Sequence, residues 1–189
     1  VEGKRLALPA PFFLMATENP IEFEGTFPLP EAQKDRFFLS LKIGYPPREA
    51  ESQILETQRR TTHPITDLKP VTEPASVLGI QKTVVNVRVD GSLKDYILDI
   101  VAASRKHPLF QLGISPRGSL ALYKGAQALA ALRGRDYVIP EDIKALVLPI
   151  FSKRVIIKPE QLMKGITEEI ALGQLIDSID LPVFKEAAG

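Results

Sequence analysis

The sequence predicts a mostly α-helical protein whose N-terminal part carries strands of an α/β domain. Two short, continuous apolar runs near the N-terminus have the pattern of strands that are buried on both faces. From residue 75 onwards, apolar residues recur instead at helical spacing, and Ser or Pro stands before several of the runs. With 44% hydrophobic and 25% charged residues, the 189-residue chain has the composition of a globular protein.

The predicted strands cover residues 11–17 and 36–43, and Gly44 ends the second one. Roughly 18 residues separate the two runs, which is long enough for a parallel crossover. Residues 1–8 have the pattern of a short hairpin. Two strands that are apolar on both faces do not form a stable sheet alone, and the rest of the chain offers nothing obvious to cover them. We therefore predict that residues 1–46 belong to a larger α/β domain.

The remainder of the chain is predicted to be helical. Residues 49–60 have the pattern of a polar helix, residues 61–74 are rich in Pro and Thr and form a linker, and residues 75–85 are helical despite a Val-rich end. Ser92 is the predicted cap of the next helix, with Asp95 completing a capping box. The predicted buried stripe of that helix consists of Leu93, Ile97, Ile100 and Val101.

Two strong helices follow. Ser115 is a predicted N-cap with Pro in the first turn after it, and Gly134 marks the end of this Ala-rich helix. The last strong helix begins at Pro140, and Lys153 and Arg154 suit its negative C-terminal end. Residues beyond this point are less regular and are predicted to form a tail.

Several chemistries are absent from the sequence. The chain has no Cys, so disulfides and thiolate zinc sites are excluded, and His63 and His107 lack the spacing of metal ligands. It contains no Gly-x-x-x-x-Gly-Lys-Ser/Thr loop and no apolar strand that ends in an Asp-Glu pair. The sequence therefore contains no evident binding site for a nucleoside triphosphate or its magnesium ion.

Charge and hydropathy restrict the partners and the location. A net charge of +1 gives no general attraction to nucleic acid, which makes nucleic acid an unlikely partner. No apolar run is long enough to span a bilayer, so we expect no membrane span and a cytoplasmic protein.

Two residues of the N-terminal part are candidates for contacts to a phosphate. Asn19 directly follows the first predicted strand, where ligands bind in open α/β sheets; its amide could orient a water molecule or a phosphate oxygen, or Asn-Pro could simply start a turn. Arg36 stands at the entrance of the second predicted strand, where it could reach a neighbour's phosphate as an arginine finger does, or form a salt bridge with Asp35 or Glu31.

Arg117 is a third candidate because it breaks a local rule. It lies in the first turn of a predicted helix, where the macrodipole is positive and a cation costs about 0.3–1 kcal/mol. Gly118 weakens the same turn by roughly 0.5–1 kcal/mol. Two unfavourable residues at one point often indicate a site, and an anion between the helix N-terminus and Arg117 would remove the penalty. The alternative is a solvated arginine.

These three residues lie inside segments that resemble the signature of MoxR-type AAA+ ATPases. The segments are residues 12–22 (FFLMATENPIE), 24–37 (EGTFPLPEAQKDRF), 112–117 (LGISPR) and 133–142 (RGRDYVIPED). Their order and spacing also match, and the resemblance covers residues 1–157. Lys34, where the family usually has an apolar residue, and Glu18, where Gln is common, are minor departures. The missing Walker A and Walker B half is the major one.

The resemblance implies a role for each candidate residue. Asn19 matches the sensor-1 Asn, which places the attacking water. Arg36 matches the arginine finger, which reaches the ATP of the adjacent subunit. Arg117 matches the sensor-2 Arg of the lid. The resemblance further implies ATP and Mg in the complete protein, a homo-oligomeric ring expected to be a hexamer, and a client protein complex that the ring remodels or assembles. We expect this chain alone to bind nucleotide weakly and to be inactive.

On this resemblance, the fold is the α/β remnant of an AAA+ P-loop core, with two buried parallel strands and a short hairpin, followed by a predominantly α-helical lid domain. The predicted division is residues 1–46 for the core remnant, 47–74 for the polar helix and linker, 75–157 for the lid and 158–189 for the C-terminal tail.

Two alternatives remain open at this point. One is a non-enzymatic helical module that binds protein or nucleic acid. The other is an AAA+ motor that acts on nucleic acid, which a basic, aromatic-bearing pore loop would favour, and this chain contains no such loop.

Overall fold

The computed structural model describes residues 5, 7–18, 29–59 and 64–182. The chain divides into two compact units, one formed by residues 1–14 and 41–81 and the other by residues 15–40 and 82–189. The larger unit carries both Arg36 and Arg117, so it contains the described part of the predicted site.

The smaller unit contains helix α2 (Arg48–Thr57), the 3-10 turn η1 (Pro64–Asp67) and most of helix α3 (Pro74–Val84). Helix α2 confirms the predicted polar helix, and α3 confirms that its segment is helical rather than a strand. Neither helix has a buried residue. Packing among the described residues therefore contributes little to the stability of these two helices.

The strands predicted at residues 11–17 and 36–43 are not formed in the part of the chain that the structure describes. Neither segment pairs with a neighbouring strand, and the side chains of Phe13, Met15 and Ile43 are 79%, 82% and 95% exposed. A strand needs a neighbouring strand for its N–H and C=O groups, and no described strand pairs with either segment. The prediction of two buried parallel strands is therefore wrong for this chain. The hairpin predicted near the N-terminus lies largely outside the described residues.

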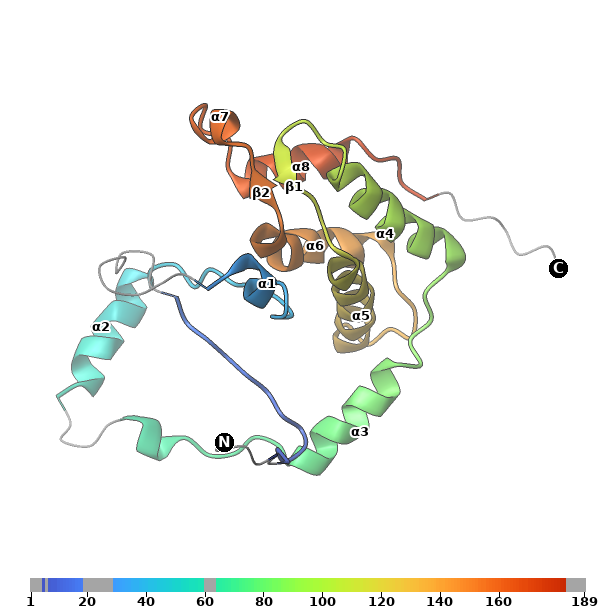
Figure 1. Ribbon diagram of the computed structural model, residues 1–189. Coiled ribbons are helices and arrows are strands. Elements are labelled where there is room, and N and C mark those ends of the chain that lie inside the picture. Colours follow the sequence, from blue (N-terminus) through green and yellow to red (C-terminus); the bar gives the residue numbers. More distant parts are fainter. Residues whose placement is uncertain (1–4, 6, 19–28, 60–63, 183–189) are drawn as a thin grey trace. The chain divides into compact units, whose positions relative to one another are not determined.

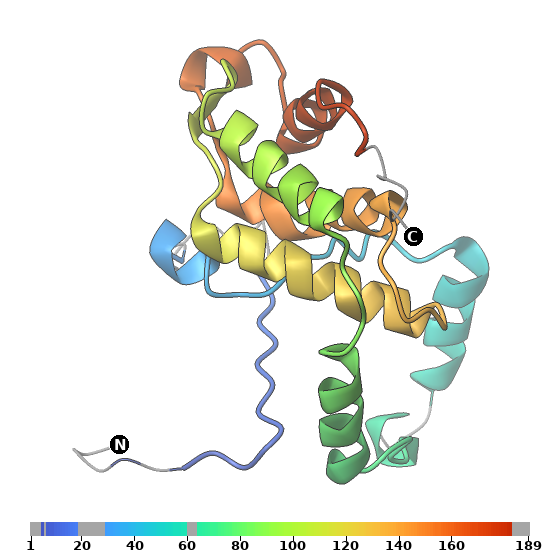
Figure 2. The same cartoon turned by 90° about the vertical axis from the view of Figure 1, so that its right-hand side faces the viewer.

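Four helices form the body of the larger unit. They are α4 (Gly91–Ser104), α5 (Pro116–Leu132), α6 (Pro140–Phe151) and α8 (Glu168–Asp177). Helix α5 packs against α4 and α6, and α8 also packs against α4 and α6 (Figure 1 and Figure 2). The shorter helical elements of this unit are α1 (Glu31–Lys34), η2 (Ser152–Arg154) and α7 (Pro159–Leu162). The chain is mostly α-helical, as predicted.

A small sheet that the sequence does not predict joins two loops of this unit. Strand β1 (Phe110–Leu112) pairs antiparallel with β2 (Ile156–Ile157), with Phe110 opposite Ile157. Strands of three and two residues are too short for an alternating pattern to be recognised. The sheet ties the segment before α5 to the segment after α6, close to the positions of Arg117 and Arg154 in the sequence.

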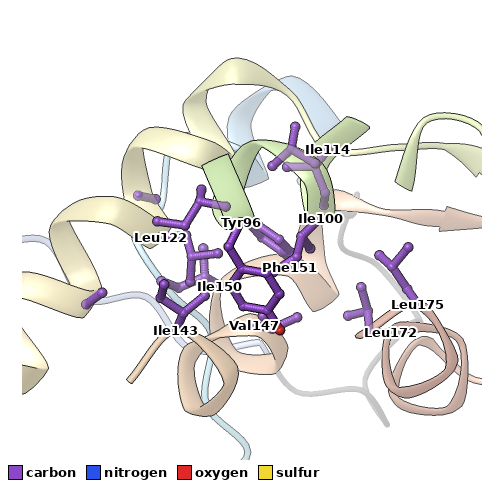
Figure 3. Close-up of a cluster of buried hydrophobic side chains, with 14 of the residues drawn as sticks. Tyr96, Ile100, Ile114, Leu122, Ile143, Val147, Ile150, Phe151, Leu172 and Leu175 are labelled. Atoms are coloured by element: carbon purple, nitrogen blue, oxygen red, sulfur yellow. The ribbon is translucent and has the colours of Figure 1, made fainter. Parts of the chain in front are cut away.

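The apolar faces of the four long helices meet in one core (Figure 3). Its fully buried side chains include Tyr96, Ile100, Ile114, Leu122, Ile143, Val147, Ile150, Phe151, Leu172 and Leu175. The predicted stripe of α4 is confirmed, since all four of its residues are buried. Leu172 and Leu175 come from the segment predicted to be a tail. Because they stand three residues apart on α8, they face the core together, and α8 is part of the same packed body.

Helix α4 begins before the predicted cap. Asp90 is the N-cap, and its carboxylate accepts hydrogen bonds from the backbone N–H of Ser92 at 2.9 Å and from the Ser92 hydroxyl at 2.7 Å. The hydroxyl bond, followed by the backbone bond, lowers the pKa of Asp90. The prediction that Ser92 caps the helix is wrong, because an Asp two residues earlier accepts from a first-turn amide, that of Ser92 itself.

Small residues on α5 allow α6 to approach closely. A Cβ atom added at Gly125 would lie 3.0 Å from Ile150 Cδ1 and 3.1 Å from Leu146 Cδ1, so a larger residue would push the two helices apart. Gln127, also buried on α5, donates from Nε2 to the carbonyl of Val87 at 2.8 Å and so satisfies its own polar group.

Replacing Leu172 with Ala should lower the free energy of unfolding of the 189-residue chain by about 2–5 kcal/mol, because it leaves a cavity in the core. Ile170→Ala is the matched control on the same helix, since Ile170 is 44% exposed; its effect should stay near 0.5 kcal/mol. Urea denaturation followed by circular dichroism measures both. Equal, small effects would show that α8 is not part of the core.

Candidate functional site

The structure describes two of the three predicted site residues. Arg36 is the second residue after α1 and Arg117 is the second residue of α5, and both side chains are exposed. Asn19 lies outside the described residues, so its position is not part of the geometry below. The two arginines belong to segments that are 80 residues apart in sequence and that the structure brings together through the neighbouring residues Asp35 and Ser115.

The salt-bridge alternative for Arg36 finds no support among the described residues. The carboxylate of Glu31 pairs with Lys34 at 3.3 Å, and the carboxylate of Asp35 pairs with Arg154 at 2.9 Å. Within the described part of the chain, the guanidinium groups of Arg36 and Arg117 form no ion pair. Both cations are therefore available to an external anion.

Arg154 is the centre of the surrounding structure. Its side chain is 2% exposed, and Nε donates to Asp35 Oδ1 at 2.9 Å. The two Nη atoms donate to the backbone carbonyls of Asp35, Phe37, Phe38 and Ile150. The guanidinium thus forms five hydrogen bonds, as many as it has N–H donors. These bonds hold the backbone on both sides of Arg36 against the end of α6.

The sequence predicted the contact of Arg154 to the helix end but not its ion pair with Asp35. The contact to the Ile150 carbonyl is the predicted interaction with the C-terminal end of a helix. The ion pair with Asp35 joins residues 119 positions apart, and no local pattern indicates it. The one available signal is an arginine followed by the apolar residues 155–157, which suggests burial but not a partner.

The loop before Arg117 is fixed to the end of α4. The Ser104 hydroxyl accepts from the N–H of Ile114 at 3.0 Å and donates to the Val101 carbonyl at 2.7 Å. Arg105 Nε donates to the Ile114 carbonyl at 2.9 Å. A Cβ atom at Gly113 would lie 2.7 Å from backbone atoms of Arg105, so only Gly permits this close approach.

Gly118 has a packing reason that the sequence does not reveal. It is buried in the first turn of α5, and a Cβ atom there would lie 2.3 Å from Ile114 Cγ2 and 3.3 Å from Arg154 Cδ. The helix weakening attributed to Gly118 is therefore explained by packing, and it no longer counts as a sign of a ligand. The unfavourable placement of Arg117 at the positive end of α5 remains without a compensating anion among the described residues.

Residues 133–142, another segment that resembles the MoxR signature, have a structural role. Asp142 is fully buried and accepts hydrogen bonds from Arg133 at 2.9 Å, from Arg135 at 2.6 and 2.8 Å, and from the N–H of Ile139 at 3.1 Å. Burial alone would raise the pKa of Asp142, but the bonds from Arg135 and Ile139 outweigh it and keep the pKa below its ordinary value. The role of this network is to stabilise the start of α6 and not to bind a ligand.

Lys153 lies beside the Arg154 ion pair in an unfavourable setting. Its Nζ atom is buried, has no hydrogen-bond partner among the described residues and lies 5.7 Å from the centre of the Phe37 ring. Burial, and then the charge of Arg154, lower the pKa of Lys153 to about 8, against a smaller opposite effect of Asp35.

The described residues suit contacts to a phosphate but not a complete nucleotide site. Two exposed guanidinium groups can bind phosphate oxygens. The described part of the chain contains no group of three or more His, Cys, Asp or Glu that could hold a metal ion, so it offers no magnesium site. A hollow of about 310 Å³ is lined by Arg88, Asp90, Tyr137, Val138 and Ile139, and it includes neither Arg36 nor Arg117.

Within the described ranges, no helix has the length and apolar character needed to cross a membrane.

Comparison with family profiles gives two matches. Residues 1–39 match the ATPase family associated with various cellular activities (AAA), and residues 102–172 match the AAA lid domain. Asn19 and Arg36 fall in the first match and Arg117 in the second. The lid match extends into α8, in agreement with the packing of α8 in the core.

Similar proteins agree with these two family matches. Over 187 residues the chain is 46% identical to the uncharacterized protein YeaC of Bacillus subtilis, covering 99% of this chain and 58% of YeaC. It is 35% identical to the chaperone MoxR1 of Mycobacterium tuberculosis, covering 96% of this chain and 50% of MoxR1. The crystal structure of a proposed ATPase from Cytophaga hutchinsonii superposes with a TM-score of 0.86 at 30% identity, covering 94% of this chain and 56% of that one. The chain thus spans about half the length of the curated relatives it matches.

Arg154→Met should lower the free energy of unfolding of the chain by about 3 kcal/mol, because it leaves Asp35 and several carbonyls without their donor. Arg36→Met is the matched control and should change the stability by less than about 0.5 kcal/mol, since that side chain is exposed. Urea denaturation measures both variants. A small effect at Arg154 would mean that the buried ion pair does not organise this region.

The low pKa of Lys153 predicts a rise in stability with pH. Between about 8 and the ordinary value of 10.5, the unfolded chain binds a proton at Lys153 that the folded chain has already lost, so raising the pH favours the folded state. Lys153→Met should be the more stable protein at pH 7, and its advantage should shrink as the pH rises from 8 to 10.5. Lys144→Met, at an exposed position of α6, should show no such pH-dependent difference. If thermal melts across this range show the same pH dependence of stability for both variants, the lowered pKa of Lys153 is contradicted.

Proposed function

Because the chain belongs to the MoxR group of AAA+ ATPases, we propose that it supplies the lid and the phosphate-sensing residues of an ATP-hydrolysing machine. The triphosphate itself is held by a Walker-type loop that these 189 residues do not contain. ATP is the substrate, and the complete protein uses Mg²⁺, which neutralises charge on the phosphates when bound.

The observation that carries this proposal is that Arg36 and Arg117 form no ion pair with any described residue. Arg117 places a cation at the positive end of a 17-residue helix, which costs about 0.3–1 kcal/mol and which a bound anion would offset. Arg36 is exposed although acidic residues are adjacent to it, because those carboxylates are engaged with Lys34 and Arg154. Both residues also stand at the positions that the MoxR signature assigns to phosphate contacts.

Each residue has a separate task in the proposed mechanism. Arg117 acts as sensor 2 near the γ-phosphate. Arg36 acts as an arginine finger on the ATP of the adjacent subunit. As negative charge develops on the phosphoryl oxygens, both guanidinium groups stabilise it from fixed positions, so little reorganisation is needed during the reaction. Asn19, as sensor 1, orients the attacking water.

The use of Arg36 on a neighbour requires a ring. We propose a homo-oligomer, a hexamer by family resemblance, in which each finger completes the next site. Hydrolysis then moves the lid and remodels or helps assemble a client protein complex in the cytoplasm. The name of the similar MoxR1, a chaperone, supports a protein client.

In the full-length protein, Arg36→Ala should lower kcat by roughly 10³-fold, as loss of an arginine finger does. Arg117→Ala should lower kcat by about 10²-fold, as loss of one transition-state donor does. Arg48→Ala, on the exposed surface of α2, is the control and should keep full activity. The 189-residue chain alone should show no turnover. A non-enzymatic helical module predicts no ATPase activity in the full-length protein either.

A mixing experiment separates action on a neighbour from action within a subunit. Subunits with Arg36→Ala keep their own site, and subunits with Asn19→Ala keep their finger. If Arg36 acts on the neighbour, the mixture regains activity that neither variant has alone. If mixing restores nothing although both variants still assemble, the assignment of Arg36 as a finger in trans is wrong.

A further inference from the structure

Three side chains join the segments that carry Arg36 and Arg117. The Ser115 hydroxyl donates to the Asp35 carboxylate, with distances of 3.0 and 3.2 Å to its two oxygens. The same carboxylate accepts from Arg154 Nε at 2.9 Å. We call Asp35, Ser115 and Arg154 the Asp35 cluster. All three belong to the larger unit.

The cluster is adjacent to both arginines. Asp35 precedes Arg36 directly, and the carbonyls of Phe37 and Phe38 on its other side accept from Arg154. Ser115 is the N-cap residue of α5, and Arg117 is the second residue of that helix. The backbone that carries each arginine is therefore tied to the same carboxylate or to its partner.

The Ser115 hydroxyl contacts Asp35 and does not cap its own helix. A serine at an N-cap normally accepts a hydrogen bond from an amide of the first turn, which stabilises a helix by about 1 kcal/mol. Ser115 has the extended backbone of an N-cap but makes no such bond; its hydroxyl is used on Asp35 instead. A hydroxyl that bonds to a segment 80 residues away and not to its own helix is what a positioning role predicts.

We propose that the Asp35 cluster is a positioning device that holds Arg36 and Arg117 in a fixed relation, so that the finger and the sensor of one subunit move as one rigid body. This inference rests on the proposed function. It has a consequence for the site: Arg36 and Arg117 are presented to phosphate together, as one unit.

The test is a set of mutant cycles in the ATPase activity of the full-length protein. Ser115→Ala removes the link to Asp35 and leaves the buried Arg154 pair intact. It should lower kcat about 3- to 10-fold, with the KM for ATP changed less than about twofold and the melting temperature nearly unchanged. Ser119→Ala is the matched control on the same turn, because among the described residues that hydroxyl bonds to the local carbonyl of Pro116 and not to Asp35; it should keep the activity of the parent protein.

The double variants decide whether Ser115 acts through the arginines. If it does, the fold-loss caused by Ser115→Ala should fall toward 1 in the Arg117→Ala background and in the Arg36→Ala background, since there is no longer an arginine to position. The same fold-loss in all backgrounds, no loss at all, or an equal loss from Ser119→Ala overturns the inference. If Arg36→Ala and Arg117→Ala themselves keep full activity, the proposed function fails and the inference falls with it.

Discussion

The ion pair between Arg154 and Asp35 is the interaction on which the site region depends. A guanidinium that is almost fully buried is tolerated only when its donors are satisfied, and here every one is used on a carboxylate or a backbone carbonyl. The pair constrains both of the segments that it joins. It fixes the turn that follows α1, and it closes the C-terminal end of α6. Arg36 projects from the fixed segment without taking part in the pair.

The helical core provides the frame for this constraint. Helices α4, α5, α6 and α8 bury a continuous set of aliphatic and aromatic side chains, and the end of α4 holds the loop that leads to Arg117. Gly113 and Gly118 are needed because backbone or side-chain atoms occupy the space of a Cβ. The interior of the larger unit is therefore rigid, whereas the two arginines stand on its surface with no ion-pair partner among the described residues. Such an arrangement suits residues that meet a ligand held elsewhere.

Sequence reasoning succeeded where the information is local. Helical periodicity predicted the buried face of α4, and Ser-Pro and Pro-Glu-Asp predicted the starts of α5 and α6, because these signals act within a few residues. It failed where the outcome depends on distant partners. The apolar runs at residues 11–17 and 36–43 have strand-like sequences, but a strand also needs a neighbour. The partnership of Arg154 with Asp35 could not be predicted for the same reason, and α8 was missed because its short apolar stripe follows an irregular stretch. For the candidate site, the motifs indicated Arg36 and Arg117, whereas the residues that position them became evident only from the geometry.

The central claim of the proposed function is that Arg36 and Arg117, which form no ion pair with the described residues, bind phosphate. The most direct measurement is a structure of the full-length assembly with a transition-state analogue of ATP hydrolysis bound. We expect the guanidinium groups of Arg36 and Arg117 at about 3 Å from a γ-phosphate mimic, that of Arg36 on the mimic of the adjacent subunit, with the Arg154–Asp35 pair unchanged. A structure in which either arginine instead pairs with a carboxylate, or points to solvent while the site is occupied, would contradict the claim.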